Sequence, residues 1–182
     1  NVVLAAHFNS IDASLKATQI AMKHQPTACE LMDKIILDCT KENIEQNKNR
    51  FFVEGDPEGV VMVELRGTTI LEAENQANKL IEDLNNTILG YAFPIIPSEK
   101  TKQVWQLRSA GLGLLANLPG DKKAVACIED TAVAIEDLPE YIAEFSEIME
   151  GFEQRSVYYA HAGAGEIHLR PLLNLKKSED VE

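Results

Sequence analysis

The chain has 182 residues, of which 45% are apolar and 25% are charged, a length and composition that suit one domain with a hydrophobic core. Its formal net charge of −12 disfavours nucleic-acid binding, because phosphate repels an acidic surface, and no apolar run reaches the roughly 18 residues of a membrane span. The three cysteines form no CxxC pair and are odd in number, which argues against a disulfide framework and a zinc ribbon and fits reduced thiols in a cytoplasmic protein.

The first third of the chain alternates between strand and helix patterns. The apolar spacing predicts a strand over 2–8, a helix to about residue 23, a strand over 28–31 and a helix over 33–40. Ser10 can cap the first helix, and Pro26 ends it, because a residue before proline avoids the helical conformation. The polar stretch 41–56 is expected to lie on the surface. Because the chain begins inside a strand, without a methionine or a signal peptide, we expect a piece of a longer protein.

The remainder continues the alternation. Thr69 and Glu72 have capping-box spacing at the start of a helix that follows a strong strand over 59–65. Ser98 is expected to cap the next helix. The other predicted elements are strands over 91–96, 124–133, 156–160 and 166–169 and a helix over 135–152.

This order favours an α+β fold with a ferredoxin-like antiparallel sheet, covered on one side by helices. A doubly wound parallel sheet is the second choice. We expect one domain over 1–175 and a charged, frayed tail over 176–182.

The segment 161–168, His-Ala-Gly-Ala-Gly-Glu-Ile-His, is the strongest candidate site. Its glycines let the backbone turn sharply, and on a strand Glu166 and His168 point to the same face. Two imidazoles and a carboxylate suit zinc or a similar divalent ion, so His161, His168 and Glu166 are candidate metal ligands. The alternative is a glycine turn with two incidental histidines.

Other polar residues give weaker signals. Arg108 could bind a carboxylate with its guanidinium fork, or it could be a surface arginine whose stem packs on Trp105. Glu129 and Asp130 are adjacent, so on a strand they face opposite ways and form no paired-carboxylate site. The Gly111-Leu-Gly113 sequence follows a helical pattern and lacks the third glycine of a dinucleotide loop.

Three segments resemble, in the same order, the C-terminal domain family of FAD-linked oxidases, which includes D-lactate dehydrogenase, the glycolate oxidase flavoprotein subunit and D-2-hydroxyglutarate dehydrogenase. They are Trp-Gln-Leu-Arg at 105–108, Glu-Asp-Thr-Ala-Val at 129–133, and the histidine segment at 161–168, which is similar to the family's H-x-G-D-G-N-x-H signature. Weaker similarities lie at 30–33 and 63–67. Here Ala164 and Glu166 stand where the signature has aspartate and asparagine, and Ala134 replaces a proline.

The resemblance implies the substrate-binding part of a flavin-dependent 2-hydroxy-acid dehydrogenase or oxidase. Arg108 would hold the substrate carboxylate, and His161 and His168 would act on its hydroxyl, directly or through a divalent metal such as zinc. FAD would be bound mainly by an FAD-binding domain of the same parent, which is missing from this sequence, so the isolated chain is expected to be colourless and inactive. The alternative is a non-catalytic ferredoxin-like binding or interaction module.

Overall fold

The structure is a computed structural model and describes residues 1–181. Its helices are α1 (Ile11–Met22), α2 (Lys34–Glu42), α3 (Ile44–Asn47), α4 (Ile70–Asn85), α5 (Thr101–Leu114) and α6 (Leu138–Gly151). Its strands are β1 (Val2–Phe8), β2 (Ala28–Asp33), β3 (Gly59–Leu65), β4 (Gly90–Ala92), β5 (Ile95–Ile96), β6 (Lys123–Ala124), β7 (Thr131–Ala132), β8 (Ser156–His161) and β9 (Glu166–Leu173). None of the helices in this range is long and apolar enough to cross a membrane.

One nine-stranded sheet organises the chain, in the order β4-β1-β3-β2-β8-β9-β6, with β5 on β1 and β7 on β9. All strand pairs within residues 1–181 are antiparallel. The segment β4-β1-β3-β2 has the strand order of a ferredoxin-like unit, and β8 and β9 extend it beyond β2. The predicted ferredoxin-like antiparallel class is therefore confirmed, and the parallel alternative is not.

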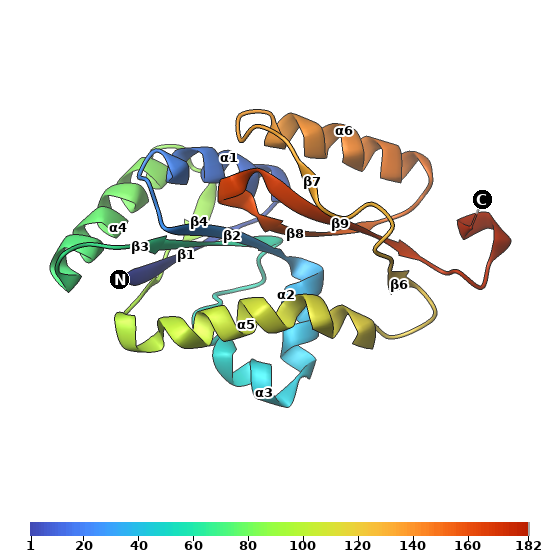
Figure 1. Ribbon diagram of the computed structural model, residues 1–182, viewed down its shortest axis with the longest axis horizontal. Helices are drawn as coiled ribbons and strands as arrows, with labels where there is room; N and C mark the ends of the chain where they lie inside the picture. Colours follow the sequence, from blue (N-terminus) through green and yellow to red (C-terminus); the bar gives the residue numbers. More distant parts are fainter. Residues whose placement is uncertain (182) are drawn as a thin grey trace.

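Helices cover both faces of the sheet, not one as expected. Helices α1, α4 and α6 lie on one face, and α2, α3 and α5 lie on the other (Figure 1). Successive side chains of a strand point to opposite faces, so each central strand contributes to two separate cores. Leu4 and Leu31 pack into the core under α1 and α4, whereas Val3 and Met32 pack into the core under α2 and α5.

The predicted helix caps are largely confirmed. Ser10 Oγ accepts a hydrogen bond from Ala13 N at 3.1 Å, and Thr69 Oγ1 accepts one from Glu72 N at 3.1 Å. The Glu72 carboxylate bonds to the backbone N–H of Thr68, one residue before the position that a capping box uses. Ser98 does not cap α5, because it lies in a 3-10 turn (Ser98–Lys100) and its hydroxyl bonds to Asn1.

Two predicted strands are interrupted. The strand expected over 91–96 is divided into β4 and β5 by Phe93 and Pro94, and a proline cannot donate to a sheet ladder. The strand expected over 124–133 is reduced to its two ends, β6 and β7. Between them the backbone of Glu129 and Asp130 takes positive φ values of 37° and 39°, which no regular strand allows.

The end of the chain, where we expected fraying, contains a 3-10 turn over Ser178–Asp180. The Asp180 carboxylate accepts hydrogen bonds from the backbone N–H of Asn174 at 2.6 Å and from the Gln154 side chain at 3.1 Å.

Candidate functional site

The hairpin of β8 and β9 carries the histidine segment. In its register Tyr159 pairs with His168 and His161 pairs with Glu166. Cross-strand partners project to the same face of a sheet, and residues two apart on one strand do so as well. The hairpin therefore places these four side chains on one face, which is the face that packs against α5 through Tyr159.

The two glycines of the segment shape the hairpin's turn. Gly165 follows a 3-10 turn over Ala162–Ala164 and has a φ of +70°, and a Cβ there would collide with the carbonyl oxygen of Val133. Gly163 approaches α1 and β2 closely, since a Cβ there would lie 2.9 Å from Cys29 Cβ and from Met22 Sδ. The segment thus requires glycine at both positions.

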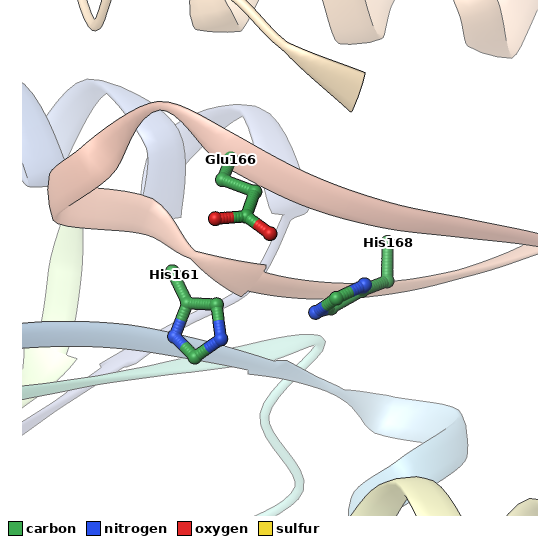
Figure 2. A group of neighbouring side chains, drawn as sticks. All are labelled: His161, Glu166 and His168. Atoms are coloured by element: carbon green, nitrogen blue, oxygen red, sulfur yellow. The ribbon is translucent and has the colours of Figure 1, made fainter. Parts of the chain in front are cut away.

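His161, Glu166 and His168 converge on one point (Figure 2). Each offers one ligand atom, and these atoms all lie within 4.8 Å of one another. The two imidazole ring centres are 5.7 Å apart. The side chain of His168 is only 13% exposed, whereas that of His161 is 48% exposed, so the group opens to solvent on the His161 side.

Arg108 is buried and points toward the sheet, which excludes a surface arginine packed on Trp105. Its guanidinium carbon lies 3.3 Å from the centre of the Tyr159 ring, and Nη2 donates to the carbonyl oxygen of Ala160 at 3.2 Å. Burial lowers the pKa of Arg108 to about 10, although Glu30 opposes that shift, so the side chain stays charged at neutral pH. Arg108 and the two histidines therefore share one face of the sheet.

Glu30 connects Arg108 to the histidines. Its Oε2 accepts a hydrogen bond from Arg108 Nη2 at 2.7 Å, and its Oε1 lies 3.0 Å from His161 Nδ1. The side chain is 16% exposed. The sequence marked Glu30 only through the weak similarity at 30–33. Period-two alternation on β2, together with the β2–β8 pairing, is what places it beside His161.

Glu129 and Asp130 both approach His168, contrary to the expectation that they would face opposite ways. Asp130 Oδ1 lies 2.6 Å from His168 Nδ1 and Glu129 Oε2 lies 3.8 Å from it, but neither contact has the alignment of a hydrogen bond. Glu129 also forms an ion pair with Arg170. The expectation failed because it assumed a strand, whereas the positive φ values turn both residues toward β9.

A cleft of about 400 Å³ opens beside the site and is lined in part by Glu30, His161, Gly163 and Glu166. A second depression, of about 620 Å³, lies between α3 and α5 and is lined in part by Trp105. We place the candidate site at the first cleft, because two of the three converging side chains, His161 and Glu166, line it and none lines the second.

No phosphate-binding loop for a flavin dinucleotide forms in the described part of the chain around Gly111 and Gly113. Both glycines lie within α5, and Gly111 packs against Ile36 and Met32. A dinucleotide loop instead follows a strand and opens a helix. The segment around Gly111 and Gly113 therefore does not form a dinucleotide-binding loop.

Comparisons with known proteins show several relatives with the same name. The chain is 27% identical to a D-2-hydroxyglutarate dehydrogenase of Pseudomonas putida and 28% identical to one of Haemophilus influenzae, each over 96% of its length. It is 24% identical to a D-2-hydroxyglutarate dehydrogenase of Escherichia coli over 92% of its length. The chain spans only 18% of the length of each of these relatives.

A solved structure and a family model cover the chain almost completely. The 4-ethylphenol oxidase of Gulosibacter chungangensis, in its isoeugenol complex, matches with a TM-score of 0.57 and 14% identity over 98% of this chain and 40% of that one, which supports the fold. The family model for the C-terminal domain of FAD linked oxidases matches residues 1–182. The chain therefore belongs to the FAD-linked oxidase C-terminal domain family.

Proposed function

We propose that residues 1–175 form the substrate-side domain of a flavin-dependent 2-hydroxy-acid dehydrogenase and orient the hydroxy acid for oxidation. The observation that carries this proposal is the convergence of His161, Glu166 and His168 on the face of the sheet that also holds Arg108. Relatives named D-2-hydroxyglutarate dehydrogenase support the substrate class, which includes D-2-hydroxyglutarate, D-lactate and glycolate. A separate FAD-binding domain of the same protein would hold the flavin, which supplies the redox chemistry.

The converging side chains fit a divalent ion such as zinc. His161 and His168 offer imidazole nitrogens and Glu166 offers a carboxylate oxygen, a donor set that zinc accepts at about 2.0–2.2 Å. Ligand atoms within 4.8 Å of one another need only small side-chain adjustments to meet one ion. Such an ion would polarise the substrate oxygen. Three protein ligands leave a coordination position for that oxygen.

Arg108 would attract the substrate carboxylate. Glu30 and Ala160 engage its Nη2, whereas its buried Nε has no hydrogen-bond partner within residues 1–181. The guanidinium therefore retains a donor for a second acceptor. Without the ion, a neutral imidazole on the same face would instead offer its lone pair to the hydroxyl proton, a role that metal coordination of that ring excludes.

Binding experiments test this proposal on the 182-residue chain. Zinc is titrated first, and D-lactate, glycolate and D-2-hydroxyglutarate are then titrated into the zinc-loaded chain by calorimetry. We expect zinc and a hydroxy acid to bind, and both to be lost in His161→Ala/His168→Ala. Tight zinc binding that survives in the double variant would place the site elsewhere. A folded chain that binds neither ligand would favour a ferredoxin-like interaction module without catalysis.

A further inference from the structure

Glu30 has a position that the proposed ligand set does not explain. It lies on β2, a strand distant in sequence from both of its partners, Arg108 on α5 and His161 on β8. Its side chain is largely buried, and a largely buried carboxylate needs charged or hydrogen-bonding partners. Its Oε2 accepts from Arg108, and both of its oxygens lie near His161 Nδ1, Oε1 at 3.0 Å and Oε2 at 2.9 Å. Glu30 does not belong to the converging group of His161, Glu166 and His168. It is therefore placed to act on the site through its neighbours.

The contact with His161 determines which ring nitrogen can bind a ligand. Neutral imidazole carries one N–H and one lone pair, and a carboxylate at Nδ1 favours the form in which Nδ1 holds the hydrogen. Nε2 then keeps the lone pair that a metal ion or a substrate proton requires. Figure 2 shows one ring nitrogen of His161 on the side of His168 and the other on the far side. A carboxylate on Nδ1 thus leaves Nε2 for the side on which Glu166 and His168 converge.

Arg108 holds Glu30 in that position. The guanidinium is fixed between the Tyr159 ring and the Ala160 carbonyl oxygen, so its Nη2 presents a fixed charge to the carboxylate. This fixed charge holds the carboxylate in a position where both of its oxygens lie near His161 Nδ1. The chain of contacts thus runs from Tyr159 through Arg108 and Glu30 to the metal-facing imidazole.

We propose that Glu30 is a positioning residue that fixes the tautomer and orientation of His161, so that Nε2 faces the ion, and at the same time holds Arg108. This inference rests on the proposed metal site, but it concerns a residue outside the ligand set. Carboxylates that hold a ligating histidine from behind typically raise metal affinity by about 10–100-fold.

Two measurements on the 182-residue chain test the role of Glu30. The His161 tautomer is measured without metal by long-range proton–nitrogen NMR, and zinc affinity is measured by competition with a chromophoric chelator. We expect Nδ1–H in the wild-type chain. In Glu30→Ala we expect a shift toward Nε2–H and a loss of zinc affinity of about 10–100-fold. Glu30→Gln keeps an acceptor oxygen, so it should retain the tautomer and lose less affinity.

Glu64→Gln is the matched control. Glu64 is a buried carboxylate on β3 that pairs with Arg66, and within residues 1–181 no hydrogen bond or ion pair joins it to a histidine. This variant should change neither measurement. If Glu30→Ala is too unstable because Arg108 is left unpaired, Glu30→Leu/Arg108→Met removes both buried charges, and its tautomer and zinc affinity should change as in Glu30→Ala.

The outcomes separate the two proposals. If the wild-type chain binds no zinc, the proposed metal site is contradicted. The tautomer of His161 is measured without metal, so it still tests the effect of Glu30 on His161. Zinc binding with an unchanged tautomer and affinity in folded Glu30→Ala or Glu30→Leu/Arg108→Met overturns the inference. Cobalt(II) spectra provide a further check. Unchanged band positions in Glu30→Gln support positioning, whereas a changed spectrum would make Glu30 a ligand and also overturn the inference.

Discussion

The guanidinium carbon of Arg108 lies 3.3 Å from the centre of the Tyr159 ring, and the Tyr159 hydroxyl donates a hydrogen bond to the backbone oxygen of Arg108. A cation over an aromatic face is attracted by the ring quadrupole, and a planar guanidinium stacks there as an ammonium group cannot. Arg108 and Tyr159 therefore join helix α5 to strand β8 at the site by two contacts.

Arg108→Lys should weaken both stability and substrate binding. Lysine loses the stack and cannot donate to Glu30 and to a substrate carboxylate in the same fixed geometry. We expect the free energy of unfolding to fall by about 1–3 kcal/mol. The dissociation constant for D-2-hydroxyglutarate on the zinc-loaded chain should rise about tenfold or more. Urea denaturation and calorimetry measure the two effects.

Arg66→Lys is the control for this substitution. The Arg66 side chain is 63% exposed and pairs with Glu64 on β3, away from the histidines. Its stability should change by less than about 0.5 kcal/mol, and hydroxy-acid binding should be unaffected. Equal effects of the two substitutions would contradict a specific role for Arg108.

Gly165→Ala should disrupt the turn that brings His161 and Glu166 together. An alanine at a φ of +70° is strained, and its Cβ would collide with the Val133 carbonyl oxygen. We expect a loss of about 2–4 kcal/mol in the free energy of unfolding, together with weaker zinc binding. Gly120→Ala is the control, because Gly120 has a φ of +82° but open space around its Cβ position, so it should cost only about 1 kcal/mol. Similar losses for both variants would show that the Val133 contact is unimportant.

Local signals in the sequence predicted most of the fold. Ser10 and Thr69 cap the helices they were expected to cap, because an N-cap needs only a few neighbouring residues. The sequence also predicted a sharp turn at the glycines and a shared face for Glu166 and His168, because these residues all lie within one hairpin.

The parts that failed depend on contacts between distant segments. Glu129 and Asp130 have strand-like neighbours, and only their positive φ values bring them to His168. Glu30 meets Arg108 and His161 because β2 pairs with β8, and no local pattern reveals that pairing. Helices cover both faces because the central strands are apolar on both sides. Every residue of β1 and β3 is buried, and this near-continuous apolar pattern is typical of a strand that is covered on both faces.

Asp33 should make stability depend on pH. Asp33 is 3% exposed, and its carboxylate accepts hydrogen bonds from Ile36 N, which caps α2, and from Tyr158 N. Burial raises the pKa of Asp33 to about 7, although these hydrogen bonds and the nearby Arg155 lower it. The folded chain therefore binds the Asp33 proton more tightly than the unfolded chain, whose value lies near 3.8. The Asp33 contribution to stability is fully present below about pH 4 and is lost as pH rises to about 7.

The measurement compares wild-type and Asp33→Asn by urea denaturation from pH 4 to pH 8. Asparagine still caps a helix but does not titrate, so the wild-type chain should lose a few kcal/mol more than the variant over this range, at about 1.4 kcal/mol per pKa unit. Subtracting the variant removes the opposite slopes of paired surface carboxylates. Parallel pH profiles would mean that the pKa of Asp33 is the same in the folded and unfolded chains, which would contradict the prediction.

The charge around the histidines predicts that metal must precede an anionic substrate. Two arginines lie there, and each is already paired with a glutamate, Arg108 with Glu30 and Arg170 with Glu129. Asp130 and Glu166 add further negative charge beside His168. Without a cation, a carboxylate substrate therefore meets a net negative site, and repulsion at a few ångströms costs on the order of 1–4 kcal/mol near a protein surface.

Glu166→Gln should accordingly have opposite effects with and without zinc. In the zinc-free chain it removes one negative charge, so D-lactate should bind somewhat more tightly than to the wild type. In the presence of zinc it removes a ligand, so zinc affinity should fall about tenfold or more and D-lactate binding at limiting zinc should weaken with it. Calorimetric titrations of D-lactate at several zinc concentrations measure both effects, and Glu147→Gln, an exposed substitution on α6, controls for the change in net charge. If Glu166→Gln changes D-lactate affinity in the same direction with and without zinc, Glu166 acts through charge alone or through coordination alone. If the wild-type chain binds D-lactate as tightly without zinc as with it, the proposed order, in which the metal binds first, is contradicted.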